Sequence, residues 1–147
     1  MTNSTPDSDS NSTPKVAIYI DGSCNPNPGA AGIGAVLIFG LHRKELCEPI
    51  GHSSSNGAEI MAAVIALKTL KQPCTVTVYS DSQYLVRTMT GEYNRGANMA
   101  LWIMLDQAAQ PHVITWKWVR GHNGNLHNER AHSLAEQAMR ISEQGEL

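Results

Sequence analysis

Two short runs of β-branched and aromatic residues, VAIYI at 16–20 and TVTVY at 75–79, are followed within two residues by an aspartate, Asp21 and Asp81. Such runs, bounded by turn-forming residues, are typical of β-strands. In sheets whose strands alternate with helices, ligands and reacting groups gather at the carboxyl ends of neighbouring strands. The two runs therefore predict a sheet that brings two carboxylates to one place.

The rest of the chain predicts further strands and helices. Residues 33–39 and 44–50, joined by 40–43, have the pattern of an antiparallel hairpin or meander. The Ala-rich segment 56–71 has apolar residues at helical spacing and stops before Pro73. Strands first, and then helices and strands in alternation, predict an α/β domain in which helices cover a mixed sheet. The other expected elements are a helix at 99–109, a strand at 113–119 and a helix at 128–141.

The composition indicates one folded domain between polar ends. Of the 147 residues, 41% are hydrophobic and 16% are charged, which suits a single domain with its own core. Residues 2–14 are all Ser, Thr, Asn, Asp or Pro, and such a segment cannot bury enough apolar surface to offset its ordering entropy. We therefore expect a disordered leader over 1–14, a domain over 15–143 and a tail over 144–147.

The cysteines and the hydropathy pattern bear on the compartment. The three cysteines are an odd number without a CxxC pair, which argues against a disulfide framework and a structural zinc site. No run approaches the roughly 18 apolar residues of a membrane span, and the first residues lack the pattern of a signal peptide. We expect a cytoplasmic protein that contacts no membrane and is a monomer.

Four side chains are candidates for chemistry: Asp21, Asp81, Glu59 near the start of the helix at 56–71, and His122 in a Gly-flanked loop. Each also has an ordinary explanation, because Asp is common in turns, Glu suits the first turn of a helix and His is common at surfaces. Their coincidence favours a site. Clustered carboxylates repel one another unless a cation lies between them, and hard oxygen ligands favour Mg²⁺ or Mn²⁺ over zinc.

Four motifs together resemble those of ribonuclease H type 1, in order and spacing. They are IYIDGSCNPNPG at 18–29, NGAEIMAAVIAL at 56–67, YSDSQYLV at 79–86 and WVRGHNGNLHNERAHSLA at 118–135. The resemblance covers residues 15 to about 143. It is specific because four separate motifs fall in one order, whereas a lone DGS or GH would carry no information.

The resemblance implies a fold, an activity and roles for the candidate residues. The family has a mixed five-stranded sheet, with strands 1 to 3 antiparallel, flanked by helices. Its members are endoribonucleases that hydrolyse the RNA strand of RNA/DNA hybrids with two metal ions, leaving 3′-OH and 5′-phosphate ends. Asp21, Glu59 and Asp81 match its first three metal-binding carboxylates, with Asp21 bridging both ions and the other two holding the leaving-group ion. His122 matches a mobile loop histidine that relays protons or helps the product leave.

The family's fourth carboxylate is absent, because His132 stands at its position after the triplet Asn128-Glu129-Arg130. Three interpretations compete. His132 could coordinate a metal ion through a neutral ring nitrogen, which would favour Mn²⁺ over Mg²⁺. It could instead position water or phosphate without binding metal. Finally, the replacement could disable the enzyme and leave a weakly active or inactive hybrid-binding protein.

The chain has 11 Lys and Arg against 13 Asp and Glu, and its net charge is −2. It therefore has no overall positive field to attract nucleic acid, and the substrate contacts that the resemblance implies must come from individual residues. Segment 87–100 contains only Arg87 and Arg95 as basic residues, so we expect weak hybrid affinity. By resemblance, Asn27 and Ser54 match positions near a DNA-strand phosphate, and Cys24, Asn56 and Gln83 match positions facing the minor groove.

A second enzyme alternative is another nuclease or polynucleotidyl transferase of the same broad fold.

Overall fold

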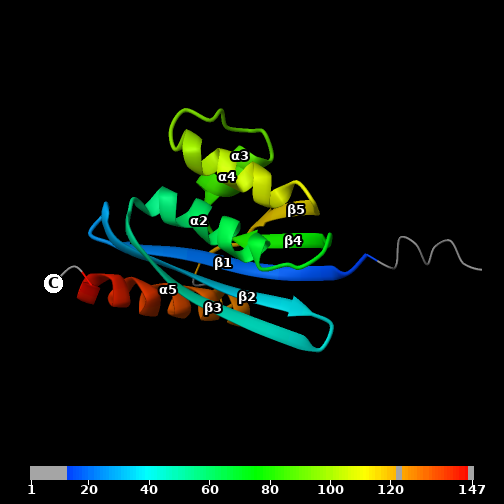
Figure 1. The fold of residues 1–147 in the computed structure, drawn as a ribbon, viewed down its shortest axis with the longest axis horizontal. Helices are drawn as coiled ribbons and strands as arrows, with labels where there is room; N and C mark the ends of the chain where they lie inside the picture. Colours follow the sequence, from blue (N-terminus) through cyan, green and yellow to red (C-terminus); the bar gives the residue numbers. More distant parts are fainter. Residues whose placement is uncertain (1–12, 122–123, 146–147) are drawn as a thin grey trace, which may run out of the picture.

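The structure, a computed structural model, describes residues 13–121 and 124–145. These residues form a five-stranded sheet with the order β3-β2-β1-β4-β5 (Figure 1). The predicted leader lies almost entirely outside the described residues, so the proposed ends of the domain stay predictions. None of the helices in 13–121 and 124–145 is long and apolar enough to span a bilayer.

The sheet is mixed, as the sequence predicts. Strands β1 (Lys15–Asn25), β2 (Gly29–Phe39) and β3 (His42–Ser53) pair antiparallel. Strands β4 (Thr75–Ser80) and β5 (Val113–Trp118) extend the sheet in parallel on the other side of β1. A two-residue turn whose first residue, Gly40, has φ +58° joins β2 to β3, which explains the glycine there.

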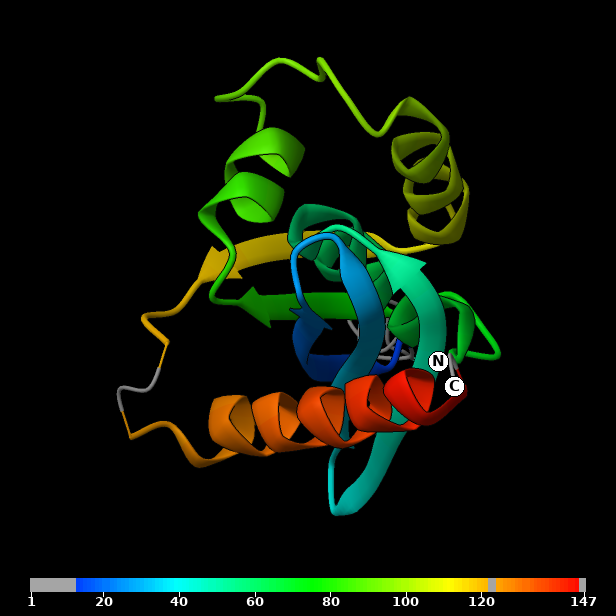
Figure 2. The ribbon, with the colours of Figure 1, turned by 90° about the vertical axis from the view of Figure 1, so that its left-hand side faces the viewer.

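Helices cover both faces of the sheet. Helices α2 (Ser55–Lys68), α3 (Gln83–Met89) and α4 (Met99–Ala109) lie on one face, and α5 (Leu126–Gly145) lies on the other (Figures 1 and 2). The main core fills the space between the sheet and α2–α4. Its largest fully buried side chains include Trp102, Ile18, Ile20, Ile60 and Leu85.

Several predicted boundaries are corrected by the structure. Strand β1 continues to Asn25, well past the predicted 16–20, because its pairing with β2 persists through turn-forming residues. Helix α2 ends at Lys68 rather than 71, where the Thr69 hydroxyl donates a hydrogen bond to the Ile65 carbonyl. Helix α3 has no counterpart among the predicted elements, and α5 is longer at both ends than 128–141.

Helix α5 packs directly on the backbone of β2 at two glycines. A Cβ at Gly32 would collide with the Ala138–Met139 backbone, and a Cβ at Gly34 would collide with the carbonyl oxygen of Ala131. Both positions are glycine because only a residue without a side chain allows so close an approach. Since Gly34 pairs with Asp21 across the strands, this contact also sets how near α5 lies to Asp21.

An exposed ion-pair group ties the same helix to β3. Arg130 on α5 donates to both carboxylate oxygens of Glu45 at 2.9 and 3.0 Å, and Arg43 donates to Glu45 at 2.8 Å. These two guanidinium groups lower the pKa of Glu45 from its ordinary 4.5 to about 2. The group therefore favours the docked position of α5 wherever Glu45 is ionised.

Replacing Gly34 with Ala should lower the free energy of unfolding by about 1–3 kcal/mol, because the new methyl group forces α5 away from β2. Chemical denaturation would measure the change. Gly96→Ala is the matched control, since a Cβ at Gly96 meets nothing within 4 Å. Equal stability of the two variants would contradict the close packing described for Gly34.

Replacing Glu45 with Gln should reduce stability at pH 7 by less than about 1 kcal/mol, because exposed ion pairs are screened by solvent. A lowered pKa in the folded state stabilises the protein above the unfolded-state pKa and loses that effect as the pH falls. The difference in stability between the parent and Glu45→Gln should thus shrink as the pH falls below about 4.5 and vanish near pH 2. Thermal unfolding at a series of pH values would test this, with Glu48→Gln on the same strand as the control.

Candidate active site

Asp21 and Asp81 lie side by side because of the register between β1 and β4. The parallel pairing of these strands ends at Ile20 and Ser80, so each aspartate directly follows the last pair. The expectation that Asp81 follows a strand is confirmed. The expectation that Asp21 ends its own strand is wrong, because β1 continues beyond it against β2.

Glu59 reaches these aspartates from α2. A Cβ at Gly22, the residue after Asp21, would lie 2.6 Å from the Ala58 carbonyl carbon and 2.8 Å from the Glu59 nitrogen. Strand β1 and helix α2 therefore touch through their backbones at this point. The sequence interpretation placed Glu59 in the first turn of the helix. Ser54 is the N-cap of α2 and the first turn contains no acidic residue, so Glu59 instead lies beyond that turn.

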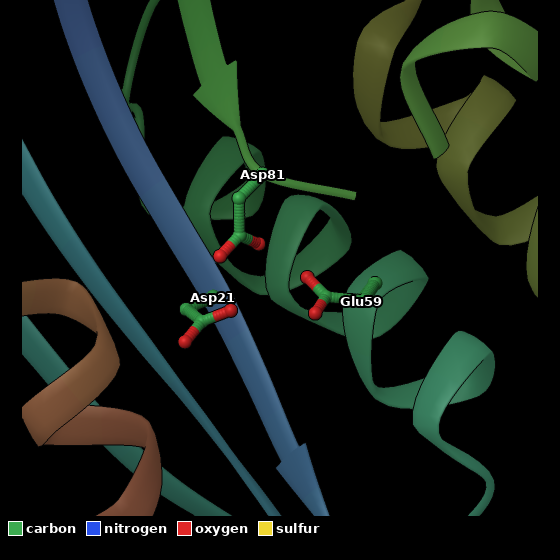
Figure 3. Close-up of side chains that lie close together, drawn as sticks. All are labelled: Asp21, Glu59 and Asp81. Carbon is green, nitrogen blue, oxygen red and sulfur yellow. The ribbon is translucent and has the colours of Figure 1, made fainter. Parts of the chain in front are cut away.

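The three carboxylates point toward one another (Figure 3). One ligand atom from each of Asp21, Glu59 and Asp81 can be chosen so that all lie within 4.8 Å of one another, close enough to share a metal ion. Asp21 is only 3% exposed, and Oε1 of Glu59 is buried without a hydrogen-bond partner among the described residues. Burial, and then the charges of Asp21 and Asp81, raise the pKa of Glu59 well above its ordinary value.

His132 on α5 lies beside one member of this cluster, Asp21. Its Nδ1 lies 2.7 Å from Oδ2 of Asp21, and its Nε2 lies 3.4 Å from Oε2 of Glu136. The hydrogen bond to Asp21 raises the pKa of His132, although partial burial acts in the opposite direction. The ring thus sits against one of the three carboxylates, at the place where the motif comparison expects a fourth acidic ligand.

Residues at the end of β5 and in the loop after it border Asp81. His122 itself lies outside the described residues, so its predicted role stays a prediction. The backbone of Gly121 lies against the Asp81 side chain, because a Cβ at this position would be 2.8 Å from Oδ2 of Asp81. The Trp118 indole donates a 3.2 Å hydrogen bond to the Asp81 carbonyl. The sequence alone indicates no role for Gly121 or Glu136. The only signal for Gly121 is its position next to His122, and the only signal for Glu136 is its position four residues after His132.

Three of the expected substrate-contact residues meet at the start of α2. The side-chain oxygen of Asn27 accepts a 2.9 Å hydrogen bond from the Ser55 amide, and the Ser54 hydroxyl accepts one of 2.9 Å from Gly57. The Cys24 thiol lies 3.4 Å from the Ser55 hydroxyl. Each of these side chains therefore has a local structural role, whatever else it contacts.

The other two, Asn56 and Gln83, are exposed near the starts of α2 and α3. Basic side chains near them are already engaged. Arg95 forms two hydrogen bonds with Asp106, at 2.6 and 2.9 Å, and Arg87 lies over the Tyr93 ring. Segment 90–98, between α3 and α4, forms no helix or strand. Both arginines of segment 87–100 thus have partners within the described residues, and the weak hybrid affinity expected from the sequence stays a prediction.

Comparison with known proteins places the chain in one family. A family model described as RNase H matches residues 13–140. Ribonuclease H of Cupriavidus metallidurans is 45% identical over 138 residues, which cover 85% of this chain and 95% of that protein. Ribonuclease HI of Caulobacter vibrioides is 41% identical over 142 residues, which cover 87% and 95% of the two chains.

Solved structures agree. The N-terminal RNase H domain of a Mycobacterium tuberculosis protein superposes with a TM-score of 0.76 at 26% identity, covering 92% of this chain and all of that one. LC9-RNase H1, a type 1 RNase H with the type 2 active-site motif, gives a TM-score of 0.79 at 28% identity, over 88% of this chain and 74% of that one. The motifs, the mixed sheet and these matches agree, and the chain belongs to the type 1 ribonuclease H family of enzymes.

Proposed function

We propose that this protein hydrolyses the RNA strand of RNA/DNA hybrids. The observation that carries the proposal is the group of three carboxylates, Asp21, Glu59 and Asp81, at the carboxyl end of β4. A structurally similar protein, LC11-RNase H1, has been solved in complex with RNA/DNA hybrid, with a TM-score of 0.71 at 26% identity over 86% of this chain. The hybrid is therefore the substrate that both the site and the relatives support.

The carboxylates suit divalent metal ions. Buried, mutually repelling carboxylates need a cation or a proton, and the buried Glu59 Oε1 has no hydrogen-bond partner in 13–121 and 124–145. Two bound ions would polarise the scissile phosphate, activate water and stabilise the leaving oxygen. In the proposed arrangement Asp21 holds both ions, and Glu59 and Asp81 hold the ion on the leaving-group side. The products would carry 3′-OH and 5′-phosphate ends.

For His132, we propose the role of a metal ligand through Nδ1. Support comes from the position of this nitrogen, 2.7 Å from Oδ2 of Asp21, the carboxylate that would hold both ions. In this structure Nδ1 donates a hydrogen bond to that oxygen, and it would release the proton on binding metal. An imidazole ligand favours Mn²⁺ relative to an all-carboxylate site, because hard oxygen ligands suit Mg²⁺ better. The ring would hold the ion that activates water. Its other possible roles, positioning water or disabling the site, are alternatives that experiment distinguishes.

The place of action is also a proposal. The cysteines Cys24, Cys47 and Cys74 are all free, as in a reducing compartment. We place the protein in the cytoplasm, acting as a monomer on hybrids formed there. Gel filtration with light scattering and fractionation of cells would test these two points.

Asp81→Asn should reduce cleavage of an end-labelled RNA in an RNA/DNA hybrid by more than about 100-fold, because loss of a metal ligand removes several kcal/mol of transition-state stabilisation. Assays would use Mg²⁺ and Mn²⁺ separately. Asp106→Asn, at an exposed aspartate bonded to Arg95, is the matched control and should cut like the parent. A parent protein that binds hybrid but cuts with neither ion would support the hybrid-binding alternative. Equal cutting of single-stranded RNA or duplex DNA would support another nuclease.

His132→Asp should shift the metal preference toward Mg²⁺, because it replaces an imidazole with the hard carboxylate found in the family motif. We expect the ratio of cleavage rates in Mn²⁺ and Mg²⁺ to fall by about tenfold. His52→Asp, at an exposed histidine on β3, controls for the charge change. An unchanged ratio in His132→Asp would show that His132 does not ligate metal.

A further inference from the structure

Glu136 lies one helical turn after His132 on α5. Residues four apart on a helix share a face, and the Nε2 of His132 is 3.4 Å from Oε2 of Glu136. The ring is therefore flanked by carboxylates on both sides, Asp21 at Nδ1 and Glu136 at Nε2. Neither the motifs nor the family match gives Glu136 a role.

A histidine that binds metal through one ring nitrogen carries its proton on the other. In metalloproteins that second nitrogen almost always donates to a carboxylate, a carbonyl or water, and this partner fixes the tautomer and the ring orientation. The placement of His132 suits this form, since Nε2 lies 3.4 Å from Glu136 and Nδ1 faces the acidic cluster. The proton with which Nδ1 now bonds Asp21 would leave when a metal ion binds there. A carboxylate ligand at position 132 would have no tautomer for a partner to fix.

We propose that Glu136 is a positioning residue for His132, which accepts the Nε2 proton and holds Nδ1 toward Asp21, Glu59 and Asp81. This inference rests on the proposed function, in which His132 ligates a metal ion. It adds that the replacement of the fourth aspartate by histidine works together with a carboxylate one turn later.

The surroundings of the pair suit this role. The side chains of His132 and Glu136 are 34% and 40% exposed, so neither is locked by the core and the ring needs a partner to fix its rotation. The helix that carries both is held close to β2 by the glycine contact at Gly34. That contact sets the distance of the helix, and hence of both residues' backbones, from Asp21.

The test is calorimetric titration of MnCl₂ into the full chain, with thermal unfolding to check each variant. Glu136→Ala should weaken Mn²⁺ binding by about tenfold, the lower end of the effect of losing such a partner. Glu136→Gln should keep most of the affinity, because its amide oxygen still accepts the Nε2 proton. Glu143→Ala, at another glutamate of α5, is the matched control and should bind like the parent.

A double variant separates positioning from charge. If Glu136 acts through the His132 ring, adding Glu136→Ala to a protein that already carries His132→Ala should not weaken Mn²⁺ binding further. Three results would overturn the inference. The Mn²⁺ affinity could be unchanged in Glu136→Ala, or Glu136→Ala could still weaken Mn²⁺ binding tenfold in the His132→Ala background. The third is that Glu136→Gln binds Mn²⁺ as weakly as Glu136→Ala.

Failure of the underlying proposal gives a different pattern. If His132→Ala binds Mn²⁺ like the parent while Asp81→Asn does not, the acidic cluster holds metal without His132, and both the proposed ligand and its positioning residue are wrong. If the parent takes up no Mn²⁺ at all, the metal site itself is contradicted, and the inference fails with it.

Discussion

The repulsion among three carboxylates is the constraint on which the rest of the structure depends. Asp21, Glu59 and Asp81 place ligand atoms within 4.8 Å of one another, and burial raises the pKa of Glu59 well above its ordinary value. Such a group is costly unless positive charge compensates it. The fold nevertheless holds the three side chains in a fixed placement: one carboxylate comes from the middle of the sheet, one from a strand end and one from a helix docked on that sheet.

Rigid placement in turn depends on backbone contacts through glycine. At Gly22, strand β1 touches the backbone of α2 beside Glu59, and at Gly34, strand β2 touches α5 at Ala131, the residue directly before His132. Each contact brings an acidic or basic side chain to Asp21 from opposite faces of the sheet. A methyl group at either glycine would collide with the backbone of the helix and force it away from the sheet. Stability and site geometry are therefore coupled at the same positions.

Periodicity and residue type could predict the sheet, the helix at 99–109 and the acidic cluster, because strand runs that end near aspartate carry local signals. The extension of β1 past Asp21 could not be predicted in this way, since residues 22–25 have the composition of a turn and are strand only through pairing with β2. Helix α3 was missed because its seven residues are too few for a clear period. The role of Glu136 depends on which face of α5 meets Asp21, and only packing decides that.

The exchange of aspartate for histidine at position 132 changes what its surroundings must supply. An aspartate presents two equivalent oxygens on a short side chain, so many orientations can serve a metal ion. An imidazole presents one lone pair in its plane, on whichever nitrogen lacks the proton, and a wrong tautomer offers none. A histidine ligand at this place would therefore need a proton acceptor on its far side, which can be a carboxylate, a carbonyl or water. Glu136, 3.4 Å from Nε2 on the same helix, occupies that side, as the proposed positioning role requires.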